Sequence, residues 1–326
     1  MTTVDTPLQR ARALPTRQLL LAALPGILLI TLVLVISVRQ PTFLSPISLR
    51  TIAASAAPIA LIALGQTFVI LTGGIDLSIA VLTSFGTVLL ATWMDDLGGF
   101  AVLAMVVAIT SAGLLNGFIT AYAQVPSFVV TLGAMGLWSG VALAVSGASA
   151  VTVGENYPMI GWLTGTRVGG VALSVYVTLA LAILIALAFK NLARGKSLHA
   201  IGLAESAALM SGVRTRHARL LAFGASGFCA ALAAIVLTSS QYSGSPTLAD
   251  ALLLPAIAAV VVGGTAITGG IGGPMRTIIG ALVIAVLRVG MRSLGVDPAW
   301  EQVVYGAVII AAVALTLDRK RIGIVK

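Results

Sequence analysis

The most restrictive feature of this sequence is a stretch of 116 residues, 51–166, that contains neither lysine nor arginine. A membrane-spanning helix needs about 20 mostly apolar residues, and only helices or closed barrels satisfy the backbone inside a bilayer. The apolar runs are too long and too unalternating for barrel strands. With 59% hydrophobic and 9% charged residues, the chain also lacks the polar surface of a water-soluble domain. We therefore expect an all-α, polytopic membrane protein.

Ten apolar segments are expected to be transmembrane helices, and two of them, 77–94 and 251–267, are short enough to be partly re-entrant. The ten are 19–38, 51–71, 77–94, 99–123, 127–146, 171–189, 218–238, 251–267, 277–294 and 301–317. With the N-terminus inside, 14 of the 19 basic residues fall on one side, so both termini are expected to be cytoplasmic. The expected division is a cytoplasmic tail 1–18, a transmembrane domain 19–317 with a cytoplasmic loop 190–217, and a tail 318–326.

Two glycine-rich breaks interrupt the apolar sequence. The first, Leu71–Ser78, contains Asp76, whose carboxylate either marks a transport pathway or caps the following helix together with Ser78. The second runs from Gly263 to Pro274. Such breaks at matching places in two halves are typical of internally repeated transporters, although glycines also serve close helix packing.

The loop 190–217 is the one sizeable cytoplasmic segment expected between helices. Within it, residues 198–213 predict a short amphipathic helix, which either inserts into a partner's groove or rests on anionic lipid. The sequence 194–197 imitates a phosphate-binding loop but has Lys190 in place of the first glycine, so any ATP must be handled by another polypeptide. His199 and His217 lack clustered co-ligands, Cys229 is expected to be a packing residue, and no catalytic motif is present.

Several stretches resemble, in chain order, the permeases of ribose-type ABC importers. They are 66–78 (QTFVILTGGIDLS), Asn116-Gly117, 126–133 (PSFVVTLG), Ala200-Ile201-Gly202 and 256–265 (AIAAVVVGGT). The resemblance extends from about residue 45 to 317. It implies a subunit of the bacterial inner membrane with three kinds of protein partner: a second permease copy, cytoplasmic ABC ATPase subunits, and a periplasmic or lipid-anchored solute-binding protein. Neither a cofactor nor nucleic acid is expected.

In this family the segment 198–213 resembles the helix that docks into the ATPase, and the residues expected to couple are Leu198, Ile201, Gly202, Glu205, Ala208, Leu209, Gly212 and Val213. The chain departs from the family's pattern at Leu253-Leu254-Pro255, where a Glu-Leu-Asp triplet is usual. It also has Arg288 and Arg292 where Asn residues are common. These arginines either dock acidic residues of the binding protein or an anionic or polyol substrate, or they snorkel to lipid phosphates.

The expected function is therefore to form the pathway for a monosaccharide or a related small polar solute, while ATP is hydrolysed on a separate subunit. The expected pathway residues are Gly73, Gly74, Asp76, Ser78, Asn116, Phe128 and Thr131. A carrier or channel that works alone is the first alternative, although only Asp76 offers the ionisable relay that coupled carriers need. A membrane-bound enzyme is the second, and it lacks a nucleophile–base or metal set. The sequence names no particular sugar.

Overall fold

The computed structural model describes residues 16–191 and 193–316, so the expected tails 1–18 and 318–326 lie almost wholly outside the described residues. The regular secondary structure of the described residues is helical apart from two short antiparallel strand pairs. The helices are α1 (Thr16–Arg39), α2 (Pro46–Leu71), α3 (Ile79–Leu97), α4 (Phe100–Tyr122), α5 (Ser127–Ser146), α6 (Pro158–Gly165), α7 (Leu173–Asn191), α8 (Ala193–Leu203), α9 (Glu205–Met210), α10 (Thr215–Gln241), α11 (Leu253–Val262), α12 (Pro274–Ser293) and α13 (Ala299–Thr316), with 3-10 turns η2 (Pro41–Leu44) and η3 (Asp250–Leu252). The strand pairs are β1 (Val151–Thr152) with β4 (Ser243–Gly244), and β2 (Arg167–Val168) with β3 (Val171–Ala172).

The helices agree with an all-α polytopic membrane protein. Each of the ten expected apolar segments overlaps one of them, and α2, α4, α5, α10 and α12 are long and apolar enough to cross a membrane. Shorter apolar helices cover Ala23–Arg39, Leu173–Phe189, Asp250–Val262 and Ala299–Ala314. The segment 251–267 is not helical throughout, because α11 ends at Val262, before Gly263-Gly264, and the chain from 264 to 273 forms a loop.

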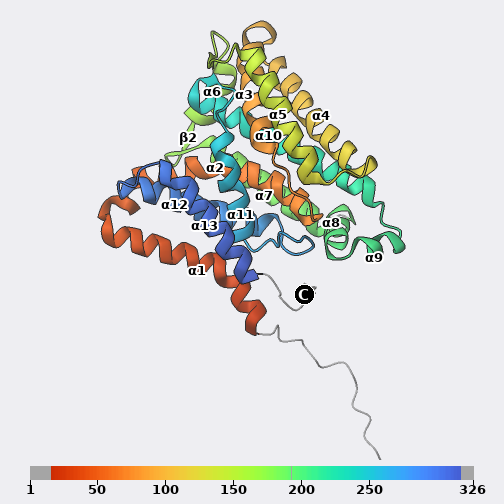
Figure 1. The fold of residues 1–326 in the computed structure, drawn as a ribbon. Helices are drawn as coiled ribbons and strands as arrows, with labels where there is room; N and C mark the ends of the chain where they lie inside the picture. The colour runs from red at the N-terminus through yellow and green to blue at the C-terminus, as the bar shows by residue number, and fades with distance from the viewer. Residues whose placement is uncertain (1–15, 192, 317–326) are drawn as a thin grey trace, which may run out of the picture.

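The core is built around α10, which packs against α4, α2 and α3 (Figure 1). Its contact with α4 is close because glycines meet at the crossing. A Cβ on Gly113 would lie 2.6 Å from the Phe223 carbonyl oxygen and 2.9 Å from the Gly227 Cα. Small residues at such a crossing let the two backbones approach, which is how helices gain packing energy inside a membrane.

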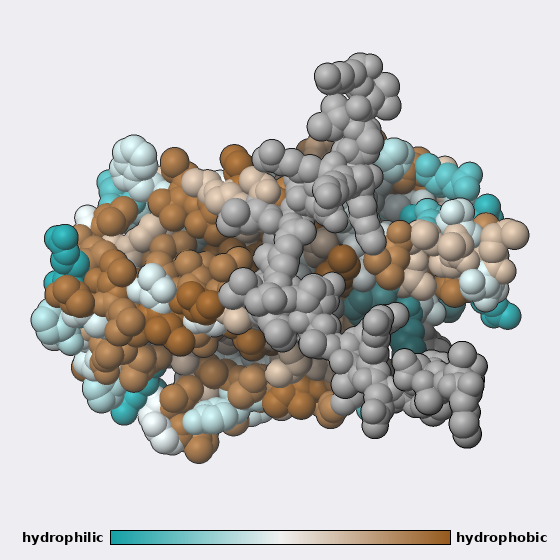
Figure 2. Space-filling model, turned by 90° about the horizontal axis from the view of Figure 1, so that it is seen from below, coloured by the Kyte–Doolittle hydropathy of each residue, from teal (hydrophilic) through white to brown (hydrophobic). Residues whose placement is uncertain are grey.

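The apolar surface forms a broad area between two polar ends. Figure 2 shows hydrophobic residues over the middle of the lower face and hydrophilic residues at its left and right ends. At one end lie α6 and the β2–β3 pair, and at the other lie α8 and α9 (Figure 1). We call these the α6 end and the α8–α9 end. This distribution fits helices that cross a bilayer with their connections in water on both sides.

The segment 198–213 is two helices, not the single amphipathic helix expected from its sequence. Ala204 has extended backbone (φ −164°, ψ 99°) and separates α8 from α9. The change of direction lets both helices bury apolar side chains against the body: Leu198 and Ile201 from α8, and Ala208 from α9. The single-helix prediction was therefore wrong. One continuous helix would have a single straight apolar face, whereas α8 and α9 each pack an apolar face against the other helices in a different direction.

Candidate functional site

A buried polar network holds the break between α2 and α3. Asp76 is fully buried, and its Oδ1 accepts hydrogen bonds from the Ser78 backbone N–H (3.0 Å) and from Ser78 Oγ (2.6 Å). Its Oδ2 accepts from Ser226 Oγ of α10 at 2.7 Å. Buried polar groups are costly unless paired, and here both carboxyl oxygens are paired.

Two amides extend this network. Asn116 of α4 donates from Nδ2 to Ser78 Oγ at 2.9 Å. With its amide oriented to satisfy both neighbours, Gln66 of α2 donates to the Asp76 carbonyl oxygen (3.0 Å) and accepts from the Asp76 N–H (3.3 Å). The network therefore joins α2, α4 and α10 to one chain reversal. Sequence reasoning missed Ser226, because it lies 150 residues from Asp76 and its neighbours are ordinary apolar residues.

The residues expected to line a pathway are distributed over three environments. Asp76, Ser78, Asn116 and Thr131 are buried inside the subunit. Thr131 Oγ1 donates to the Ser127 carbonyl at 2.9 Å, as helical threonines do. Gly73 and Gly74 border a cavity at the α8–α9 end, and Phe128 lies exposed on α5. Within one subunit these residues do not surround a common opening.

Gly202 allows α8 to pack closely against the end of α2 and the glycine loop before α12. Gly202 lies so close to the Leu71 carbonyl and the Gly270 N–H that a Cβ there would overlap both. The same two groups bond each other, Gly270 N to Leu71 O at 3.0 Å. His199 adds contacts through Nδ1 to the Gly195 carbonyl (2.9 Å) and Nε2 to the Gly272 carbonyl (3.1 Å). The end of α2, the glycine loop before α12 and α8 thus form one packed unit.

The α9 helix presents apolar side chains outward. Leu209 is 60% exposed and Met210 is 89% exposed, whereas Ala208 is buried. Glu205 binds Arg219 of α10 at 2.7 Å, which ties α9 to the first turns of that helix. Of the residues expected to couple, Leu198, Ile201 and Ala208 are buried and Gly202 packs on the body. Glu205, Leu209 and Gly212 are exposed, and Val213 is half-buried.

At the α6 end, the two unusual arginines meet a carboxylate. Glu301 of α13 is nearly buried, and its Oε1 accepts from Arg292 Nε at 2.7 Å while its Oε2 lies 3.3 Å from Arg288 Nε. The Tyr305 hydroxyl lies 3.5 Å from Oε2. Sequence reasoning missed Glu301, although the short turn between α12 and α13 and the two carboxylates that follow the arginines, Asp297 and Glu301, were a usable signal.

Comparison with known proteins places this arrangement in a family. The family model described as "Branched-chain amino acid transport system / permease component" matches residues 48–313. The chain belongs to the permeases of ABC importers. It is 36% identical over 301 residues to the ribose import permease protein RbsC of Bacillus subtilis (strain 168), covering 91% of this chain and 92% of that one. RbsC of Escherichia coli (strain K12) is 33% identical over 300 residues, covering 90% and 92%. No solved structure matches the chain.

Membership explains why the described site has no catalytic arrangement of its own. A permease of this ribose-type family is a transport subunit, not an enzyme, and its ATPase is a separate subunit. A solute-binding protein is the other general partner of such importers. The D-allose transport system permease protein AlsC of Escherichia coli (strain K12) is also similar, at 29% identity over 282 residues and 86% of each chain.

Proposed function

We propose that this permease imports a monosaccharide across a bacterial inner membrane. The names of its relatives, which import ribose and allose, support this substrate class. In this proposal the ten apolar segments all cross the bilayer, the ten-residue α11 only together with the chain that leads into it, and the α8–α9 end and both termini lie in the cytoplasm. The basic residues of the sequence support that orientation, since cytoplasmic loops carry an excess of lysine and arginine.

We also propose that the segment 198–213 couples the permease to the ATPase. The observation that carries this role is the exposed apolar tip of α9, Leu209 and Met210, on a segment packed against α2, α10 and the glycine loop. An exposed apolar helix on the cytoplasmic side fits a groove of a partner protein. Because Gly202 contacts the end of α2 directly, a displacement of this segment by the ATPase would move the membrane helices. The segment therefore acts as the coupling element.

Reconstitution tests this role. We expect the double variant Leu209→Ser plus Met210→Ser to lower ATP-driven uptake of radiolabelled ribose at least tenfold in proteoliposomes with the ATPase and the binding protein. The variant Met275→Ser is the control, because Met275 is also exposed (49%) at the α8–α9 end but lies on α12. Undiminished uptake in the double variant would contradict coupling through α9. Uptake against a gradient by the permease alone would instead favour a stand-alone carrier.

The second copy is proposed to pack along α5. Of the residues in the most apolar stretch of α5, only 22% are buried in the subunit, against 78% for the corresponding stretch of α2. Gly133, Gly136 and Gly140 recur along α5, and a Cβ on any of them would meet nothing within 4 Å. A stripe of small residues on an unpacked helix suits close approach of an identical helix. Phe128 and its neighbours would then line a pathway between two subunits.

Crosslinking tests the α5 contact. The permease has one cysteine, Cys229, which is buried, so an introduced thiol is the only accessible one. We expect Gly136→Cys to form an intermolecular disulfide under mild oxidation, whereas Leu103→Cys, on the exposed face of α4, stays monomeric. Equal crosslinking of both variants, or of neither, would refute an α5 interface.

Docking of the binding protein is proposed for the α6 end. Arg288 and Arg292 share one carboxylate, so the group keeps one net positive charge, and Arg292 remains about half exposed. Complementary charges at such a site steer association. The combined variant Arg288→Met, Arg292→Gln and Glu301→Gln removes all three charges, so that no charged side chain is left without its partner. Unchanged affinity for the loaded binding protein would reject this docking site.

A further inference from the structure

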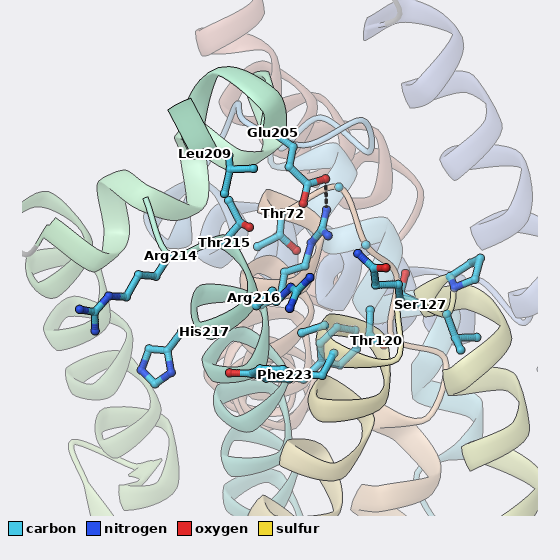
Figure 3. Close-up of a pocket in the computed structure, with 18 residues that line it drawn as sticks. Thr72, Thr120, Ser127, Glu205, Leu209, Arg214, Thr215, Arg216, His217 and Phe223 are labelled. Carbon is cyan, nitrogen blue, oxygen red and sulfur yellow. Dashed lines mark hydrogen bonds and ion pairs between the residues drawn. The ribbon is translucent and has the colours of Figure 1, made fainter. Parts of the chain in front are cut away.

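A cavity of about 880 Å³ opens at the α8–α9 end, between α4, α5, α9 and the start of α10. Its lining includes Arg216, His217 and Arg219 from the first turns of α10, Arg214 just before that helix, Thr120 of α4 and Ser127 of α5. In Figure 3, Arg216 lies between α10 and the side chains of α4 and α5, whereas Arg214 and His217 extend to the other side of α10.

The cavity carries excess positive charge. Glu205 is the one carboxylate in its lining, and it is already bound to Arg219 at 2.7 Å. Within the described part of the chain, neither Arg214 nor Arg216 forms an ion pair. Arg216, whose guanidinium group suits planar oxygen anions, is thus left without a protein counter-charge among the described residues on the side that faces α4 and α5, and Arg214 is unpaired on the other side of α10.

Neutral donors around the cavity point to the same kind of ligand. Ser127 Oγ accepts from the Ile75 N–H at 3.2 Å, which leaves its own proton available. The helices α5 and α10 both begin at the cavity, and neither has a side-chain cap. Uncapped helix N-termini offer free N–H groups and a positive dipole end to an anion.

The apolar surface beside the cavity indicates where the anion comes from. Tyr122, which lines the cavity, stacks on Phe118 with ring centroids 5.2 Å apart, and both side chains are largely exposed on α4. Tyrosine near a helix end is typical of the membrane–water interface. The cavity therefore adjoins the level of lipid headgroups.

We infer that this cavity binds the phosphate of an anionic phospholipid from the leaflet at the α8–α9 end, with Arg216 as the principal ligand and Ser127 as a supporting group. Basic pockets between membrane helices hold anionic headgroups in the same way. The bound headgroup would lie beside the Glu205–Arg219 contact, so it would brace α9 against α10. Only the identity of the leaflet depends on the proposed function, since binding itself requires neither transport nor partners.

Binding of short-chain lipids to the full-length permease in a neutral detergent tests the inference. The probes are dihexanoyl phosphatidylglycerol, the zwitterionic dihexanoyl phosphatidylcholine, and glycerol phosphate as the free headgroup. We expect phosphatidylglycerol to bind more tightly than the other two. Arg216→Gln should weaken it about fivefold, whereas Arg214→Gln, on the other side of α10, and Arg276→Gln should leave it unchanged. Arg276 is the matched control because it is exposed at the same end but lies outside the cavity.

Three results would overturn the inference. Equal weakening by Arg216→Gln and Arg276→Gln would indicate diffuse attraction of the basic surface rather than a site. Equal affinity for the two lipids would remove the role of charge. Glycerol phosphate that binds as tightly as phosphatidylglycerol and displaces it would assign the cavity to a soluble phosphate compound. Because Arg216 is exposed, its variant is expected to fold, and monodisperse elution confirms this for each protein before binding is measured.

Discussion

Replacement of Asp76 by alanine measures how strongly the buried network holds the fold together. The change removes the acceptor of three hydrogen bonds: from the Ser78 N–H, from Ser78 Oγ and from Ser226 Oγ. A buried donor left unpaired costs about 1–3 kcal/mol. Because the two hydroxyls can rotate toward other acceptors and the N–H cannot, we expect a total loss of about 3–6 kcal/mol.

The single cysteine provides the assay. Cys229 is buried on α10, three residues from Ser226, so a thiol reagent reaches it only when this region opens. When opening and closing are fast relative to labelling, the labelling rate follows the population of the open form. A loss of about 3–6 kcal/mol then corresponds to labelling that is faster by about 10²–10⁴-fold. Ser226→Ala, which removes one of the three bonds, should fall between wild type and Asp76→Ala.

Asp96→Ala is the control, since Asp96 is an exposed carboxylate near the end of α3 and should change stability by less than about 0.5 kcal/mol. Labelling of Asp76→Ala at the wild-type rate would refute the argument that the network braces α3 against α10. Asp76→Asn tests whether the charge of Asp76 also takes part in transport. If it keeps slow labelling but loses uptake, the Asp76 charge takes part in transport, as a pathway role requires.

Three further predictions concern close contacts. Gly202→Ala should abolish uptake without preventing expression, because its methyl group displaces α8 from the end of α2, whereas Ser206→Ala on the exposed side of α9 should be silent in the same uptake assay. Glu301→Gln should destabilise the protein by about 2–4 kcal/mol in thermal melts, since two arginines lose their shared partner. Adding Arg292→Gln should restore part of that stability, and a double variant with no such restoration would contradict the pairing. Gly113→Leu should prevent stable folding, seen as loss of a monodisperse peak, because no side chain fits where α4 crosses α10.

The positions of the helices were predictable because the bilayer imposes a strong local rule. Apolar runs of about 20 residues must be helices there, and glycine or proline marks where they end. The prediction was least accurate where that rule weakens. The segment 251–267 reduces to the ten-residue α11, and 198–213 divides at Ala204, which no breaker residue marks. In both places the end of a helix is decided by what it packs against.

The sequence by itself determined the class of this protein and its family, because hydropathy and the order of motifs can be read directly from the linear sequence. It also named Asp76 and Ser78 together as candidate caps of the following helix, whereas in the structure Ser78 makes no side-chain cap and donates to Asp76 instead. Only the tertiary structure decided that Ser226 completes that pair, that Gly202 touches Leu71, and that Glu301 lies between Arg288 and Arg292. Such contacts depend on how helices distant in sequence cross, and local hydropathy carries no information about the crossing.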